Sequence, residues 1–168
     1  PAYLARASAT LFKLGESRAA ERCAVAALSR NGLLCAAHLT LARISLGRDD
    51  RDQGLASLQN AVACPDASMA AHVLLARVLR KQGGDALVQA LYHAEAALEL
   101  DATLIAVRQT AAQLALACGD LDRATHHLAE AEAMAPEDPT NAPLRRRLAT
   151  LTAQRDLAET HDTPHTPE

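Results

Sequence analysis

The sequence predicts an all-α fold in which helical hairpins stack into a right-handed superhelix, an α-solenoid. The first observation is a self-similarity with a spacing of 34 residues, in which Gly15-Glu16 and the alanines that follow return three units later at Gly119-Asp120. The second is a composition with 2% aromatic residues and no Trp. A fixed period of this length is typical of repeat proteins, whose units stack on their neighbours rather than around one central core.

In register, the chain divides into four repeats that cover residues 1–34, 35–68, 69–104 and 105–138. The first helix of repeat 1–34 is indicated by one apolar face, formed by Leu4, Leu11 and Leu14. Gly15-Glu16 ends this helix, because glycine relieves strain at a helix terminus. The second helix is indicated by a stripe at helical spacing, formed by Ala20, Ala24, Ala27 and Leu28.

The two middle repeats follow the same plan, with polar turns at 48–50 and at 83–85. Their second helices carry small and apolar residues at helical spacing, namely Gly54, Leu58 and Ala61, then Ala90, Ala94 and Ala97. Repeat 69–104 is two residues longer than repeat 35–68. We expect the two additional residues in its turn, where an insertion costs little free energy.

The fourth repeat is followed by a helix-start signal at Thr140 or Asn141. Leu144, Leu148 and Leu151 lie on one face of a helix predicted over 139–160. A terminal helix with one polar face can cover the last exposed hairpin of a solenoid, so we interpret this segment as a C-terminal capping helix. The tail 161–168, which contains Pro164 and Pro167, is expected to be disordered.

This pattern resembles the tetratricopeptide repeat (TPR) family over residues 1–138. The resemblance depends on small residues at the positions where the family packs its helices closely, and on one Pro after the fourth hairpin: Ala20, Ala27, Ala42, Ala61, Ala76, Ala90, Ala97, Ala112, Ala124, Ala131 and Pro136. The chain departs from the family at the fourth residue of each repeat. The family prefers Trp there, and this chain has Leu4, His38, His72 and Arg108.

The resemblance implies a concave groove lined by the first helix of each hairpin. Residue by residue, this implies a peptide-binding surface made of Phe12, Lys13, Leu39, Arg43, Leu46, Val73, Arg77, Arg80, Lys81, Gln109, Gln113 and Leu116. Phe12 and the aliphatic members form an apolar strip, and five of the residues are cationic. Arg side chains on successive repeats can bind carboxylates through two parallel hydrogen bonds. The groove therefore favours an acidic, amphipathic segment. The alternative is that these cations are solvated or pair with Asp49, Asp50 or Asp85.

Charge is distributed unevenly along the chain. Residues 1–80 carry ten Lys and Arg against six Asp and Glu, a net charge of +4, whereas residues 81–168 carry seven against fourteen, a net charge of −7. This is unlike a uniformly basic nucleic-acid binder, so no nucleic-acid partner is expected.

No apolar run is long enough to predict a membrane span. The spacing of the four cysteines matches no zinc-binding motif, which favours reduced thiols and a cytoplasmic location. A composition rich in Ala, Arg and Leu indicates a bacterial origin.

The motifs of common active sites are absent from the sequence. It contains no phosphate-binding loop, no nucleophile elbow and no His-Glu-x-x-His motif. His38 and His72 occupy equivalent repeat positions, which helix packing separates by roughly 10 Å or more, too far for one metal ion. His126 and His127 are adjacent on a helix and point in different directions. We therefore expect no enzyme activity, no metal and no cofactor.

The sequence thus predicts a non-catalytic scaffold that binds a peptide or a partner protein in its concave groove. Two alternatives stay open. One is a regulatory or substrate-recognition domain of a larger enzyme or of a secretion or assembly machine, because the chain begins at a repeat boundary, at Pro1. The other is a homo-oligomerisation module that associates through the uncapped N-terminal end.

Overall fold

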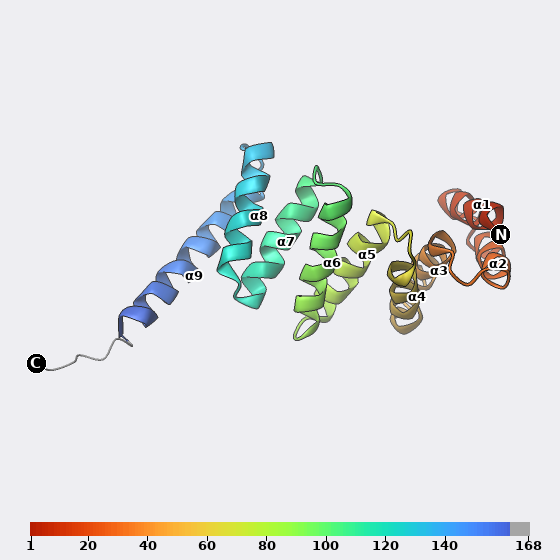
Figure 1. Cartoon of the computed structure of the whole chain (residues 1–168), viewed down its shortest axis with the longest axis horizontal. Helices are drawn as coiled ribbons and strands as arrows, with labels where there is room; N and C mark the ends of the chain where they lie inside the picture. Colours follow the sequence, from red (N-terminus) through yellow and green to blue (C-terminus); the bar gives the residue numbers. More distant parts are fainter. Residues whose placement is uncertain (162–168) are drawn as a thin grey trace, which may run out of the picture.

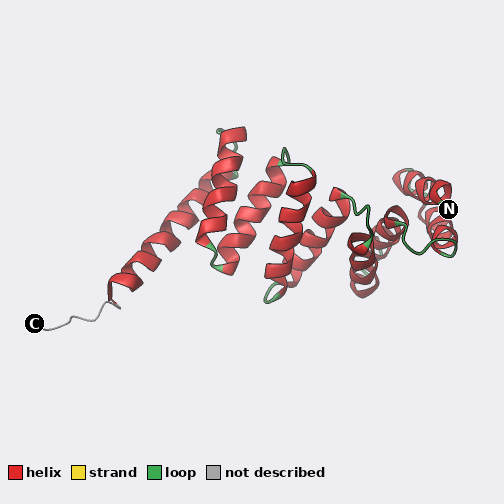
Figure 2. Cartoon of the chain, viewed as in Figure 1, coloured by secondary structure: helices red, strands yellow, loops and turns green. Residues whose placement is uncertain are grey.

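The computed structural model describes residues 1–161, and over this part the chain consists of nine α-helices and contains no strand (Figures 1 and 2). The helices are α1 (Ala2–Lys13), α2 (Ser17–Leu28), α3 (Cys35–Gly47), α4 (Arg51–Ala63), α5 (Met69–Gln82), α6 (Ala86–Leu100), α7 (Ile105–Cys118), α8 (Leu121–Met134) and α9 (Asn141–His161). They follow one another along an elongated molecule, from α1 at one end to α9 at the other. The prediction of an all-α solenoid is confirmed.

Each predicted repeat range contains one hairpin of two helices packed against each other: α1 with α2, α3 with α4, α5 with α6, and α7 with α8. Each second helix also packs on the first helix of the next unit. In addition, α1 packs on α3 and α7 packs on α9, but in residues 1–161 no contact of similar extent joins α3 to α5. The first helices of the second and third hairpins are therefore separated at the middle of the solenoid.

The helices end where the sequence predicts, at glycine and at short polar side chains. Gly15 has a φ of 82° and Gly119 a φ of 77°, a left-handed conformation that glycine adopts without a Cβ penalty. At helix starts, the side chains of Asp50 and Asp120 accept hydrogen bonds from the backbone N–H groups of Gln53 and Arg123, at 3.1 and 3.0 Å. Such caps satisfy amide groups that have no partner within the helix.

The core is built largely from alanine, which lets helices approach closely. Ala20, Ala24 and Ala27 of α2 have no exposed surface, in agreement with the predicted stripe. Larger side chains fill the spaces between hairpins, and Leu58, Leu75 and Leu114 are among the largest fully buried ones. Complete burial of a leucine side chain stabilises the fold by about 1.5–3 kcal/mol, so these interlayer leucines hold consecutive units together.

Two details of the first and third hairpins were predicted incorrectly. Leu14 does not lie on the buried face of α1 but follows its last residue, and 72% of it is exposed. The two additional residues of the third repeat do not lengthen its turn. The turns 48–50 and 83–85 both have three residues, whereas α5 and α6 have 14 and 15 residues against 13 each in α3 and α4. Lengthening a helix buries more apolar surface, whereas lengthening a turn does not.

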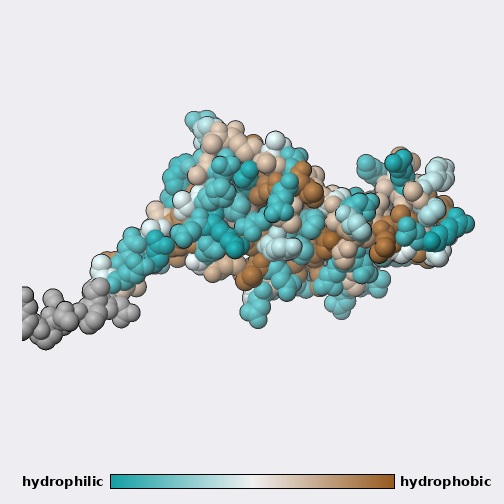
Figure 3. Space-filling model, in the orientation of Figure 1, coloured by the Kyte–Doolittle hydropathy of each residue, from teal (hydrophilic) through white to brown (hydrophobic). Residues whose placement is uncertain are grey.

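The last helix covers the fourth hairpin with an apolar face. Leu144 is buried, and Leu148 and Leu151 pack against the same core. Asn141, the first residue of α9, is 1% exposed, and its side chain donates a hydrogen bond to the Ala135 carbonyl (2.8 Å). The opposite face of α9 is hydrophilic in the view of Figure 3.

The predicted tail 161–168 lies outside the described residues except for His161, the last residue of α9. No helix within residues 1–161 has the length and apolar character needed to cross a lipid bilayer.

Candidate functional site

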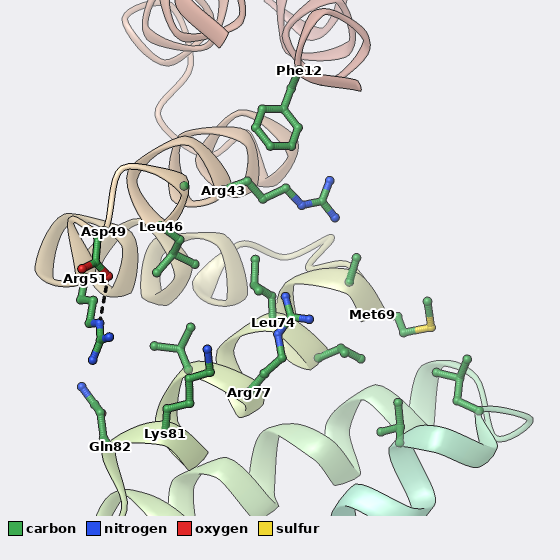
Figure 4. A pocket seen from close by; sticks show the side chains of 16 residues that line it. Phe12, Arg43, Leu46, Asp49, Arg51, Met69, Leu74, Arg77, Lys81 and Gln82 are labelled. Carbon is green, nitrogen blue, oxygen red and sulfur yellow. Dashed lines mark hydrogen bonds and ion pairs between the residues drawn. The ribbon is translucent and has the colours of Figure 1, made fainter. Parts of the chain in front are cut away.

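A groove with a volume of about 820 Å³ lies where α3 and α5 are separated. Its walls come from the C-terminal half of α3, the turn after it and most of α5, with Phe12 of α1 at one end and Leu104 and Val107 at the other. Figure 4 shows the side chains of α3 and α5 pointing into the space between these helices. The groove therefore exists because consecutive first helices do not pack on each other at this point.

The floor of the groove is apolar. Leu46 of α3 and Leu74 of α5 point into the groove, and the Phe12 ring extends from α1 toward the same space (Figure 4). Val73 and Val78 of α5 also line it. Leu74 is buried in the main core, and the partly buried side chains of Leu46 and Val78 pack against this core. The floor is thus the exposed edge of the core, and an apolar side chain placed on it would extend that core.

The rim of the groove is cationic. Arg43 extends from α3, and Arg77 and Lys81 extend from α5, into the open space (Figure 4). Among the interactions of residues 1–161, none of these three cations forms an ion pair. The alternative in which they pair internally with nearby carboxylates is therefore wrong for these three residues.

The one carboxylate at the rim belongs to Asp49, and it is already paired. Its Oδ1 atom lies 3.3 Å from Nε of Arg51, at the start of α4. Asp49 has a backbone φ of 60°, a left-handed conformation that residues other than glycine adopt uncommonly. This exposed pair leaves Arg43, Arg77 and Lys81 as an unbalanced patch of three positive charges.

The structure brings half of the predicted binding residues together in the groove and places the others elsewhere. Those that line it are Phe12, Arg43, Leu46, Val73, Arg77 and Lys81. Lys13 is exposed at the end of α1, outside the lining. Arg80 donates a hydrogen bond to Gln113 on the neighbouring hairpin (3.1 Å), also outside the lining.

Three predicted binding residues lie in the protein interior. Leu39 and Leu116 belong to the main core cluster, with 8% and 4% of their surface exposed. Gln109 is 6% exposed, and its Nε2 donates a hydrogen bond to Oδ1 of Asn141 (2.9 Å). In each case a neighbouring helix covers the position, so these side chains are not available on the groove surface.

Several lining residues were not among the predicted ones: Asp49, Arg51, Met69, Leu74, Val78, Gln82, Leu104 and Val107. Leu74 and Val78 follow the predicted Val73 and Arg77 by one residue. The prediction therefore found the correct side of α5 but included too few of its residues. Leu104 and Val107 come from the start of the next hairpin. No periodic pattern identifies them, because their position depends on how the hairpins stack.

The histidines lie in separate parts of the fold. His38 is hydrogen-bonded through Nε2 to the Gly32 carbonyl oxygen (2.8 Å). His72 faces His93 of α6, with 3.2 Å between the two Nδ1 atoms. Burial lowers the pKa of both imidazoles, and Glu99 partly opposes this for His72. Within residues 1–161 there is no group of three or more His, Cys, Asp or Glu arranged to hold a metal ion.

Among the histidines up to residue 160, His127 is the most buried, at 6% exposed, and it joins α8 to Glu95 of α6 in the preceding hairpin. Its Nε2 lies 3.2 Å from a carboxylate oxygen of Glu95, and its Nδ1 is buried without a hydrogen-bond partner. Burial lowers the pKa of His127, with smaller contributions from nearby His126 and Arg108, while Glu95 opposes them. The neutral imidazole is therefore the favoured form in the folded chain.

Comparisons with known proteins give matches in structure and none in sequence. No protein-family model matches the chain, and no curated protein matches it significantly. YrrB, described as a TPR protein with an unusual peptide-binding site, superposes with a TM-score of 0.71 at 14% identity over 96% of this chain and 91% of YrrB. A tetratricopeptide repeat protein of Parabacteroides merdae gives 0.71 at 15% identity, over 92% of this chain and 60% of its own.

TTC0263, described as a TPR protein of Thermus thermophilus, gives a TM-score of 0.50 at 25% identity over 89% of this chain and 80% of its own. At these identities the likeness concerns the arrangement of the backbone. It agrees with the stacking of helical hairpins described above. The chain therefore has the tetratricopeptide repeat fold.

Proposed function

We propose that this chain is a non-catalytic scaffold that binds a partner protein by taking an acidic, amphipathic segment into the groove between α3 and α5. The observation that carries the proposal is the combination of three unpaired cations, Arg43, Arg77 and Lys81, with an apolar floor. A cation that faces open solvent beside an apolar surface can bind a carboxylate with little loss of existing interactions.

The dimensions of the groove suit a segment of a polypeptide. Its volume of about 820 Å³ lies in the range of about 300–1,000 Å³ that is usual for binding pockets. Leu46 and Val73 would contact apolar side chains of the segment, and Phe12 would close one end. Carboxylates on the other side of the segment would pair with the rim, because guanidinium groups bind carboxylates through two hydrogen bonds.

YrrB supports this proposal by analogy, since that protein is described as having an unusual peptide-binding site and shares the fold. The analogy concerns the location of a binding surface and not the chemistry of the ligand. For this chain the ligand chemistry is inferred from its own side chains. The cationic rim favours acidic residues, and the apolar floor favours aliphatic ones.

The test is a binding titration with a defined probe. A fluorescently labelled synthetic peptide that alternates Glu pairs with Leu pairs is titrated with the full chain and with the Arg43→Glu/Arg77→Glu variant. We expect the affinity to fall by at least about tenfold, or about 1.4 kcal/mol, because two attractive charge pairs become repulsive. The matched control is Arg30→Glu/Arg147→Glu, which makes the same change in net charge at exposed positions outside the groove.

Two outcomes would contradict the proposed site. If the groove variant binds the probe as tightly as the unmodified chain, the segment is held elsewhere. If the control variant loses as much affinity, only overall charge matters. A second peptide in which Lys replaces every Glu should bind weakly to the unmodified chain, since the rim would repel it. Affinity for the acidic peptide should also decrease with salt, as screening predicts.

Self-association is a second candidate function, favoured by the surface of the first hairpin. Four large apolar side chains of the first repeat are exposed: Tyr3 at 81%, Leu14 at 72%, Leu33 at 64% and Val25 at 55%. Exposed apolar side chains can drive contact between copies of a chain. Light scattering over a range of concentrations tests this, with Tyr3→Glu expected to reduce any oligomer. A monomer at all concentrations would argue against it.

A further inference from the structure

A pair of histidines faces each other across the third hairpin, outside the groove. His72 lies in the first turn of α5, and His93 lies in the middle of α6. Their Nδ1 atoms are 3.2 Å apart, their ring centroids are 5.3 Å apart, and the rings are tilted by 40°. Both side chains are half-buried, so solvent reaches the pair. The proposed peptide-binding function uses neither of them.

The separation of the two nitrogens fits a hydrogen bond between the rings, and it also fits a shared metal ion. Two imidazole nitrogens bound to one tetrahedral zinc ion at about 2.0–2.1 Å lie about 3.3 Å apart. The observed distance of 3.2 Å between the two Nδ1 atoms agrees with this value within the tolerance of about 0.2 Å for metal–ligand distances. We propose that His72 and His93 form a two-histidine site for a divalent ion that prefers imidazole, with Zn²⁺ as its ligand.

The protonation of the pair is compatible with this role. An imidazole binds a metal ion only through a nitrogen that carries no proton. Burial lowers the pKa of both rings, and a positive charge on His72 lowers the pKa of His93 further. Without metal, one Nδ1–H donates a hydrogen bond to the other Nδ1, and the ion would replace that single proton.

The surroundings attract a cation without completing the coordination. Glu99 of α6 is close enough to His72 to oppose the lowering of its pKa, so it places negative charge near the site. No third His, Cys, Asp or Glu within residues 1–161 joins the pair as a set that could hold a metal ion. The site therefore supplies two protein ligands and leaves the other positions of the ion to water. Such an open site exchanges its metal, unlike a closed structural zinc site with four protein ligands.

The ion would link the two helices of one hairpin. The opposite side of α5 forms the floor and rim of the groove through Val73 and Arg77. A ligand that binds only the folded chain raises its apparent stability in proportion to the logarithm of ligand concentration. Zn²⁺ is therefore expected to raise the urea concentration at which the chain unfolds.

The experiment is a calorimetric titration of the full chain with Zn²⁺. The variants are His72→Gln and His93→Gln, and the matched control is His126→Gln, which alters an exposed histidine of α8. We expect the unmodified chain and the control to bind Zn²⁺ with the same affinity at this site. Each of the two site variants should bind it at least tenfold more weakly. Acidification should weaken binding to the unmodified chain, because protons compete for the two nitrogens.

A second measurement does not depend on how the variants fold. The ring resonances of the histidines in the unmodified chain are followed by nuclear magnetic resonance as Zn²⁺ is added. The resonances of His72 and His93 should shift together with one equivalent of Zn²⁺, before those of His126. If both site variants retain the affinity of the unmodified chain, or if the two rings keep their resonances in the presence of Zn²⁺, the proposal is overturned.

Discussion

Gly54 lies inside α4 at a point where the side chain of Leu46 rests on the helix backbone. A Cβ atom added at position 54 would be 2.7 Å from both Cγ and Cδ2 of Leu46, and 3.5 Å from its backbone nitrogen. Carbon atoms in ordinary contact are about 3.5–4.0 Å apart. Gly54→Ala therefore requires Leu46 to move, or α3 and α4 to separate. Because Leu46 lines the groove, a change in the packing of the hairpin should also change the groove.

Two effects of opposite sign determine the stability of Gly54→Ala. Alanine favours a helix interior over glycine by about 1 kcal/mol. Overpacking a close contact costs about 1–3 kcal/mol. The Leu46 atoms in the way include Cγ, which cannot turn aside as easily as the end of a flexible side chain. We therefore expect the overpacking to prevail, with a net loss of about 1 kcal/mol in the free energy of unfolding.

Urea denaturation followed by circular dichroism measures this change. The control is Gly47→Ala at the end of α3, where a Cβ would meet no atom within 4 Å. That variant should be as stable as the unmodified chain or slightly more stable. A double-mutant cycle with Leu46→Ala isolates the contact, since the loss caused by Gly54→Ala should disappear when the leucine is truncated. If Gly54→Ala instead stabilises the chain by the full helix-propensity gain, the packing argument is refuted.

Two further predictions concern buried polar groups. Burial lowers the pKa of His127 from its ordinary value of 6.5, so below that pH the unfolded chain binds a proton that the folded chain does not. The free energy of unfolding, measured from urea midpoints, should therefore fall as the pH drops below about 6.5. His127→Gln should reduce this fall. An equal fall in the variant would mean that other groups cause it. Asn141→Ala removes the acceptor for Gln109 at the α7–α9 contact and should cost about 1–3 kcal/mol. Gln113→Ala, at an exposed hydrogen bond, should change the same urea midpoint little, and similar losses in both would refute this reasoning.

Part of the groove lining was named from the sequence. Arg43, Arg77 and Lys81 were named because the resemblance to the tetratricopeptide repeat family implies groove positions along the first helix of each hairpin, and these three residues do line the groove. Leu116 was placed on the same surface by the same resemblance, yet it lies in the core. A position in the repeat gives the direction of a side chain relative to its own helix. It does not say whether another helix covers that direction.

The separation of α3 from α5 illustrates the second limit. Each hairpin has nearly the same local sequence plan, yet α1 packs on α3, whereas a groove of about 820 Å³ opens between α3 and α5. How far two hairpins rotate on each other depends on the volumes of all side chains in the layer between them. Small differences in those volumes add up along a solenoid, and no single motif records them.

The 34-residue period and the small residues within it determined the helices, their order and the solenoid, because these depend on interactions between near neighbours in the chain. Interactions between near neighbours did not predict the contacts of the side chains at the fourth residue of each repeat. His38 bonds to the Gly32 carbonyl, Arg108 bonds to the Ala102 carbonyl, and His72 meets His93 from the partner helix of its hairpin. Only the structure decided these contacts. The contact between His72 and His93 results from the packing of α5 on α6, and the other two depend on the path of the loop six residues before each side chain.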